Sequence, residues 1–169
     1  MIHYSISYNN PHRHLVDFEL STTTNGADKM LFQLSAWRPG RYELGNFSQN
    51  IINWQVFDEN QNQLFFKKIT KDLWEVKTNK IKQINIVYSF YSNQLDAGSC
   101  YLDEHQLYLN PVHCMFYIEG RMSEEYQIKF NIPKNYKIAS SMKRDGNILS
   151  IKSYDLLAES PIICSKSIQ

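Results

Sequence analysis

Hydrophobic and aromatic residues recur at every second position in at least six segments of the chain. In residues 2–8 they occupy the even positions, and residues 16–20 follow the same rule. Successive side chains of a strand point to opposite faces, so this period predicts strands with one buried face. The six segments are 2–8, 16–20, 30–34, 52–56, 84–90 and 126–132.

Shorter segments carry weaker strand patterns, and turn-forming residues separate them. Asp145-Gly146 favours a type I′ hairpin, because glycine accepts the positive φ that this turn needs. No helical period is sustained, although residues 42–51 and 155–158 can each hold a helical turn. We therefore predict an all-β, twisted two-sheet β-sandwich with at most one or two short helical turns. The weaker strand segments are 64–66, 73–76, 107–109, 114–118, 148–151 and 162–164.

Composition agrees with one folded domain spanning residues 1–169. The chain has 11 Tyr, 9 Phe and 3 Trp, and aromatic residues favour strands. With 18 Lys and Arg against 17 acidic residues, the net charge of +1 offers no field for nucleic acid or anionic membrane. The basic pairs Lys67-Lys68 and Lys143-Arg144 are interpreted as solvated turns and edges.

The sequence also bears on the compartment. It has no apolar run of about 18 residues, and its first residues lack a signal-peptide pattern. Three cysteines without C-x-x-C spacing suit reduced structural thiols. We expect a soluble, cytoplasmic protein without a membrane span.

Few residues form a pattern that could carry chemistry. The zinc-peptidase motif H-E-x-x-H is absent. His12 and His14 could share one side of an extended segment as metal ligands, or could simply be solvated in a turn. The run 103–105, Asp-Glu-His, would bring its side chains together only in a loop. Cys114 beside His113 is expected in the core rather than as a nucleophile. No catalytic or metal residue is assigned.

The most specific local sequence is Trp37-Arg38-Pro39-Gly40-Arg41-Tyr42, which follows the strand of residues 30–34. Pro39 and Gly40 suit the two central positions of a type II turn, where the second residue needs a positive φ. Trp37 and Tyr42 flank this turn, and we expect their rings to be buried on either side of it, which would lock a rigid corner.

This W-x-P-G-x-Y corner resembles the one in the N-terminal domain of the glycyl aminopeptidase family of zinc metallopeptidases. Later segments resemble that domain in the same order, up to a closing segment from Tyr154 to Pro161. Gly45-Asn46, Pro111 and Glu159 depart from the family pattern, which indicates a divergent member. The intervening similar segments are 44–51, 73–76 with Trp74, 86–91, 101–103, 108–110 and 118–120.

The resemblance implies a saddle-like sandwich that is not an enzyme by itself. Such a domain packs against the catalytic peptidase domain of the same polypeptide and shapes its cleft. The zinc ligands, the glutamate base and the PDZ-like C-terminal region have no counterpart here, so zinc is expected only in a catalytic domain outside this chain. The candidate cleft-facing loop contains Leu102, Asp103 and Glu104, where a carboxylate could meet the α-amino group of a peptide substrate.

Two other interpretations stay open from the sequence. A stand-alone module that binds a peptide or a glycan would need an exposed aromatic platform on one sheet. A self-sufficient enzyme would have to use His12, His14 or the residues 103–105.

Overall fold

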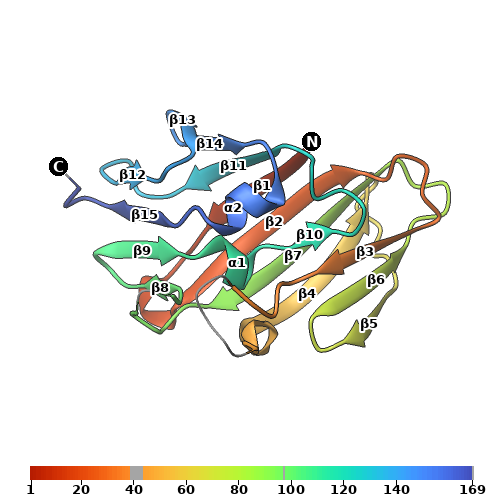
Figure 1. The fold of residues 1–169 in the computed structure, drawn as a ribbon, viewed down its shortest axis with the longest axis horizontal. Coiled ribbons are helices and arrows are strands. Elements are labelled where there is room, and N and C mark those ends of the chain that lie inside the picture. Colours follow the sequence, from red (N-terminus) through yellow and green to blue (C-terminus); the bar gives the residue numbers. More distant parts are fainter. Residues whose placement is uncertain (39–43, 97, 169) are drawn as a thin grey trace.

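The computed structural model describes residues 1–38, 44–96 and 98–168, which fold into three β-sheets (Figure 1). The largest sheet has seven strands, and the other two have four each. In spatial order the large sheet contains β13 (Lys143–Asp145), β14 (Ile148–Ile151), β11 (Tyr126–Asn131), β1 (Ile2–Ser7), β2 (Leu15–Thr23), β7 (Gln83–Tyr91) and β4 (Ile51–Asp58).

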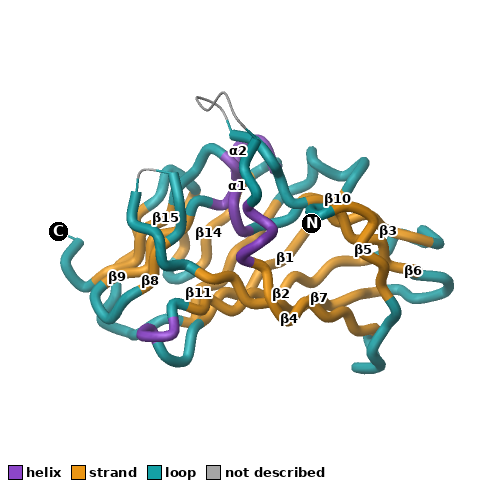
Figure 2. The backbone as a smooth tube through the Cα atoms, turned by 90° about the horizontal axis from the view of Figure 1, so that it is seen from below, coloured by secondary structure: helices purple, strands orange, loops and turns teal. Residues whose placement is uncertain are grey.

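The two small sheets cover one face of the large sheet. One contains, in order, β10 (Tyr117–Ile118), β3 (Lys29–Gln33), β6 (Leu73–Lys77) and β5 (Phe66–Thr70). The other contains β12 (Lys137–Ala139), β15 (Ile162–Ser165), β9 (Gln106–Leu109) and β8 (Tyr101–Leu102). Figures 1 and 2 show them side by side, so the predicted all-β sandwich is confirmed with its second layer divided in two.

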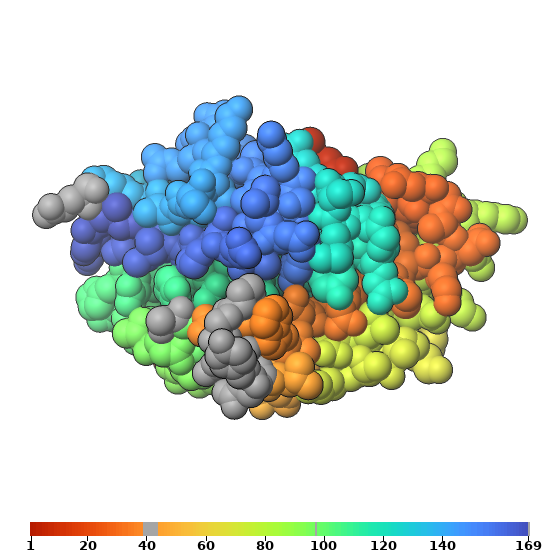
Figure 3. Space-filling view, viewed as in Figure 1, coloured from red at the N-terminus to blue at the C-terminus, as the bar shows by residue number. Residues whose placement is uncertain are grey.

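Short helical elements fill the gap between the small sheets. The helices α1 (Pro111–Cys114) and α2 (Tyr154–Ala158) lie on the same side of the large sheet as the small sheets (Figure 2). Figure 3 looks onto this side, where α2 and β15 appear in blue beside β10 in teal. Two 3₁₀ turns, η1 (Pro11–Arg13) and η2 (Phe47–Asn50), complete the described elements.

All six strands with a clear alternating pattern are present. In β1 the even positions Ile2, Tyr4 and Ile6 are buried, as predicted. β1 runs parallel to β11 and antiparallel to β2, so the two most regular early strands lie inside the sheet. One face of the large sheet is apolar because every central strand keeps the same two-residue period.

Several weaker predictions are corrected by the structure. Residues 114–118 do not form one strand, because Cys114 ends α1 and only Tyr117–Ile118 pairs with a neighbour. The strand expected at 64–66 begins at Phe66 instead. Three short strands, β8, β12 and β13, and the helix α1 were not predicted. Each has two to four residues, too few to show a period.

The hairpin between β13 and β14 forms with a turn that differs from the predicted one. Asp145 pairs with Ile148, so Gly146 and Asn147 are the central residues. Gly146 has a φ of 61°, whereas Asn147 is not among the residues with positive φ. This pattern is that of a type II′ turn, with glycine first, rather than type I′.

A salt bridge fixes the connection between β10 and β11. Arg121 donates from Nε and Nη2 to the two carboxylate oxygens of Glu124, at 2.6 and 2.8 Å. The same guanidinium donates to the Thr23 carbonyl and the Thr22 hydroxyl at the end of β2. Glu124 also accepts from the N-terminal ammonium group at 2.8 Å. These bonds, with that of Arg121 first, lower the pKa of the Glu124 carboxyl from 4.5 to about 2.

This shift predicts a pH-dependent term in the stability. Because the pKa is lower in the folded state, the term is present above pH 4.5 and is lost as the pH falls toward about 2. For a partly exposed pair we expect about 1 kcal/mol or less. Urea unfolding from pH 6 to 2 should show a shallower acid-side loss for Glu124→Gln than for the unaltered chain. Equal slopes would contradict this assignment. Hydrogen bonds from Asn62 also lower the pKa of Asp58, but this contribution is present in both proteins and cancels in the comparison.

Candidate functional site

The segment of residues 114–116, which joins α1 to β10, lies in the core and is held by tyrosine hydroxyls. Tyr88 of β7 donates to the Cys114 carbonyl at 2.6 Å. Tyr154 of α2 donates to the Met115 carbonyl at 3.1 Å. We name residues 114–116 the central segment.

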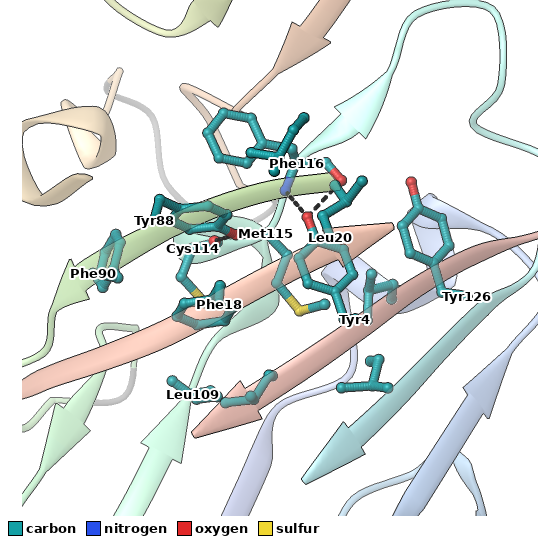
Figure 4. Packing of buried hydrophobic residues seen from close by; sticks show 14 of the residues in the cluster. Tyr4, Phe18, Leu20, Tyr88, Phe90, Leu109, Cys114, Met115, Phe116 and Tyr126 are labelled. Carbon is teal, nitrogen blue, oxygen red and sulfur yellow. Dashed lines mark hydrogen bonds between the residues drawn. The ribbon is translucent and has the colours of Figure 1, made fainter. Parts of the chain in front are cut away.

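A third tyrosine, Tyr4 of β1, serves the last residue of the central segment. Its hydroxyl accepts from the Phe116 N–H at 2.9 Å and donates to the Phe116 carbonyl at 3.4 Å (Figure 4). Buried backbone groups outside a sheet or helix need such partners, because an unsatisfied one costs about 1–3 kcal/mol. Burial raises the pKa of the Tyr4 and Tyr88 hydroxyls well above their usual range, so both remain protonated.

The tyrosine contacts extend to the segment that precedes the corner motif. Ser35 Oγ lies 3.0 Å from the Tyr154 hydroxyl, and the Gly45 N–H donates to the Ala36 carbonyl at 2.7 Å. Next to them the rings of Phe47 and His113 stack with centroids 3.7 Å apart. A Cβ atom on Gly45 would overlap the Phe47 ring, so glycine permits this close approach. Residues 35–38, 44–50, α1 and α2 therefore form one packed unit.

Four large apolar side chains project from this unit and from the neighbouring loop. Trp37 and Leu44 are 51% and 75% exposed, and Leu156 of α2 is 48% exposed. Leu95 is 63% exposed, in a loop whose Gly98 packs against the Arg38 side chain. We call the surface with Trp37, Leu44, Leu95 and Leu156 the docking face; its segments lie on the side seen in Figure 3. Large apolar side chains exposed on neighbouring segments are typical of interaction surfaces.

Trp37 of the corner motif and Trp74 of the later similar segment lie in different environments. Pro39, Gly40 and Tyr42 lie outside the described residues, whereas Trp37 lies on the docking face. Trp74 is buried in the core, where Lys68 Nζ lies 4.4 Å from its ring centroid. Lys68 is exposed on the edge strand β5, as expected, and adds a cation–π contact to its solvated position.

The first and last residues of the closing segment, Tyr154 and Pro161, also lie in different environments. Tyr154 is buried and binds the central segment, as described above. Pro161 is exposed and directly precedes β15. Proline suits the position before a strand, where no ladder donor is needed.

The candidate cleft-facing loop is the turn between β8 and β9. Leu102 is fully buried, and its carbonyl accepts from His14 Nδ1 at 2.6 Å. The Asp103 carboxylate accepts from the N–H groups of His105 and Gln106, both at 2.8 Å, so it closes the turn. Glu104 remains exposed and offers its carboxylate to solvent.

The fold brings the two histidine-containing motifs of the sequence together. His12 Nε2 and His105 Nε2 lie 3.7 and 3.3 Å from the two carboxylate oxygens of Glu104. His14 is directed elsewhere, toward Leu102, and takes a left-handed conformation with φ of 55°. Within the described ranges, no three His, Cys, Asp or Glu side chains are arranged to hold a metal ion.

The Glu104 turn does not lie on the docking face. β9 runs from this turn to α1, so the strand separates the two regions (Figure 1). The turn lies instead beside the end of β15, where the Ser165 hydroxyl donates to the His105 carbonyl at 2.9 Å. The part of the chain after β15 therefore starts next to Glu104.

The cysteines are structural, as expected. Cys100, Cys114 and Cys164 are buried free thiols. Burial raises the pKa of Cys114 well above its usual value and that of Cys164 to about 12, so neither is a thiolate near neutral pH. In the part of the chain that the structure describes, no helix is long and apolar enough to cross a membrane.

Comparison with known proteins identifies the family. A model of the Peptidase M61 N-terminal domain matches residues 3–166. The chain belongs to the Peptidase M61 N-terminal domain family. A search of curated protein sequences gave no match.

Solved structures agree with this assignment. An aminopeptidase N family protein from Idiomarina loihiensis superposes with a TM-score of 0.91 and 26% identity; the match covers 98% of this chain and 29% of that protein. An M1 zinc metallopeptidase from Deinococcus radiodurans, bound to a Tyr-Ser-Ala substrate, gives a TM-score of 0.53 at 10% identity, with 97% and 41% coverage. The M61 N-terminal domain thus shares its fold with one part of the Deinococcus metallopeptidase. It spans less than half of the length of each of these two proteins.

Sequence reasoning missed the tyrosines that hold the central segment. Tyr4 and Tyr88 were predicted as buried strand residues, and nothing in their periodicity distinguished them from phenylalanine. The available signal was the number of tyrosines on buried positions, since a buried hydroxyl needs a partner.

The hydroxyl of Tyr88 should contribute more to the free energy of unfolding than the hydroxyl of an equally buried tyrosine without a hydrogen-bond partner. Tyr88→Phe leaves the Cys114 carbonyl without its donor and should lower the free energy of unfolding by about 1–3 kcal/mol. Tyr126→Phe is the matched control, because the buried Tyr126 hydroxyl has no hydrogen-bond partner among the described residues. Chemical denaturation should show little change or a gain for the control. Similar losses for both variants would argue against the hydrogen bond as the cause.

Proposed function

We propose that this M61 N-terminal domain is the non-catalytic part of a zinc aminopeptidase of the glycyl aminopeptidase type. In this proposal the docking face packs against the catalytic domain of the same polypeptide, and the domain forms one wall of the substrate cleft. The observation that carries the proposal is the family match over residues 3–166.

The structural relative from Idiomarina loihiensis supports the link to a larger enzyme. It is described as an aminopeptidase N family protein, and this chain covers only 29% of its length at 26% identity. Most of such a protein therefore lies outside the region that resembles this domain. The PDZ-like C-terminal region of the glycyl aminopeptidase type is a further part of the proposal.

The docking face supplies the physical reason for a covering domain. Trp37, Leu44 and Leu95 are each more than half exposed, and Leu156 is 48% exposed. Burying a fully exposed leucine contributes about 1.5–3 kcal/mol, and covering a half-exposed one contributes part of that amount. The face is supported from beneath by α1 and α2, so it presents these side chains on a rigid base.

The division of labour in the proposed enzyme follows from the residues present. Zinc would be held by the catalytic domain, where it would supply an activated water for hydrolysis of a peptide bond. This chain would contribute shape and charge near the cleft. Of the two acidic residues in the β8–β9 turn, Glu104 is the one whose carboxylate is exposed and able to meet a substrate α-amino group, since Asp103 closes the turn.

A stand-alone peptide- or glycan-binding module is the alternative. Among the described residues, the large exposed aromatic side chains are Trp37 after β3, Phe65 before β5 and Tyr91 at the end of β7. They belong to three separate parts of the fold rather than to one platform. The docking interpretation is therefore preferred.

The full-length polypeptide tests the docking face. Leu156→Glu places a charge at the proposed interface, and we expect at least a tenfold loss of glycyl or alanyl arylamide hydrolysis, from lost apolar burial and a buried charge. Phe65→Glu is the matched control, because Phe65 is 75% exposed and lies before β5, away from this face. The control should keep its activity, and both variants should keep the unfolding stability of the isolated domain.

Zinc content is measured on the same preparations. The proposal expects zinc in the full-length protein and loss of hydrolysis after chelation. A full-length protein without hydrolysis and without zinc would overturn the aminopeptidase assignment. Equal activity of Leu156→Glu and Phe65→Glu would overturn the docking face.

A further inference from the structure

A hollow of about 340 Å³ lies between the β11–β12 connection and the β13–β14 hairpin. Its cationic lining consists of Lys134, Lys137 and Arg144. The apolar part includes Ile132 and Pro133, and no carboxylate lines it. This hollow is separate from the docking face, and it adjoins the Glu104 turn, because Tyr136 of its lining donates to the Glu104 carbonyl at 2.8 Å.

The charge of this hollow differs from that of its neighbours. Four other hollows on the described surface each include at least one Asp or Glu in their lining. The one that also holds Lys29 and Arg121 has both cations paired, with Glu75 and Glu124. In the described ranges, no ion pair joins the three cations of the 340 Å³ hollow to a carboxylate. Three cations that converge without a counter-charge favour an anion from solution.

The geometry of β13 directs the Arg144 side chain toward this hollow and the side chains of Lys143 and Asp145 away from it. Arg144 pairs with the buried Leu149, whereas Lys143 and Asp145 are the alternate residues of β13 and point to the opposite face. The Asp145 carboxylate is therefore on the other side of the strand. The other nearby carboxylate, Glu104, faces His12 and His105.

One end of the guanidinium is already anchored. Arg144 Nη1 donates to the Ile138 carbonyl at 2.5 Å, which holds the β13 edge against β12. The Asn147 side chain is fixed in turn by donating to the Phe130 carbonyl at 2.7 Å. An arginine held at one nitrogen loses less side-chain freedom when its remaining donors bind a ligand.

We propose that this hollow is a binding site for a phosphate-class oxyanion. Arg144 supplies directed N–H donors, and Lys134 and Lys137 supply two further positive charges. Tetrahedral phosphate oxygens suit this set, because guanidinium forms paired hydrogen bonds to phosphate and ammonium binds it as a point charge. The site assigns a role to Arg144, which the sequence placed in a solvated turn.

The test is a titration of the 169-residue chain with inorganic pyrophosphate at low ionic strength, followed by amide NMR. Saturable shifts are expected at residues 132–138 and 144–147. Arg144→Gln and Lys137→Gln should each weaken binding about tenfold or more, since each removes a charged hydrogen bond. Lys143→Gln is the matched control: it removes one charge from the same strand on the other face, and should change the affinity less than twofold.

Two variants keep the result interpretable if one of them unfolds. Arg144→Gln also removes the bond to the Ile138 carbonyl, whereas no hydrogen bond of the Lys137 side chain is found in the described structure. The proposal is overturned if no saturable shift occurs at millimolar pyrophosphate, or if Lys143→Gln weakens binding as much as Lys137→Gln. A parallel titration with citrate separates phosphate from carboxylate anions, and equal affinity for both would contradict the phosphate assignment.

Discussion

Hydrogen bonds from three buried tyrosines to the central segment are the constraint on which the rest of the structure depends. Residues 114–116 cross the core from the last residue of α1 to the start of β10, and their polar backbone groups must find partners there. Tyr4, Tyr88 and Tyr154 supply these partners from β1, β7 and α2. The bonds connect the large sheet to the elements above it, so the two layers have a fixed spacing and orientation.

The docking face is a consequence of this arrangement. Tyr154 of α2 is hydrogen-bonded both to the central segment and to Ser35. The segment that carries Trp37 is therefore held in a fixed position relative to the core. The stacked Phe47 and His113 rings add a second connection, from η2 to α1. Exposed apolar side chains on such a base can meet a partner without first becoming ordered, which reduces the entropic cost of association. In the proposed enzyme this rigidity would keep the cleft wall in place.

The sequence predicted the fold class and the central strands because burial on one face imposes a two-residue period that long strands display clearly. β1, β2 and β7 each have at least six residues and were recognised directly. β8 and α1 were not, because two or four residues are too short for any period. The turn of the β13–β14 hairpin was shifted by one residue, since Asp-Gly and Gly-Asn both suit a two-residue loop and only strand pairing decides between them.

The candidate site was less predictable, for a different physical reason. Contacts such as Glu104 with His12, or Tyr88 with Cys114, join residues far apart in the chain, and only the tertiary fold brings them together. The corner motif led us to expect a buried Trp37 ring, but that side chain is 51% exposed, while Pro39, Gly40 and Tyr42 lie outside the described residues. The polar groups of the site therefore depend on the topology, whereas the apolar strands depend mainly on local sequence.

Amide hydrogen exchange, compared between the isolated domain and the full-length polypeptide, tests the central claim most directly. If the docking face is covered by a catalytic domain, residues 35–38, 44–50 and 154–158 should exchange more slowly in the full-length protein. Residues 66–70 of β5, which form the far edge of a small sheet, should exchange at the same rate in both. Equal exchange of all these segments in the two proteins would contradict the account.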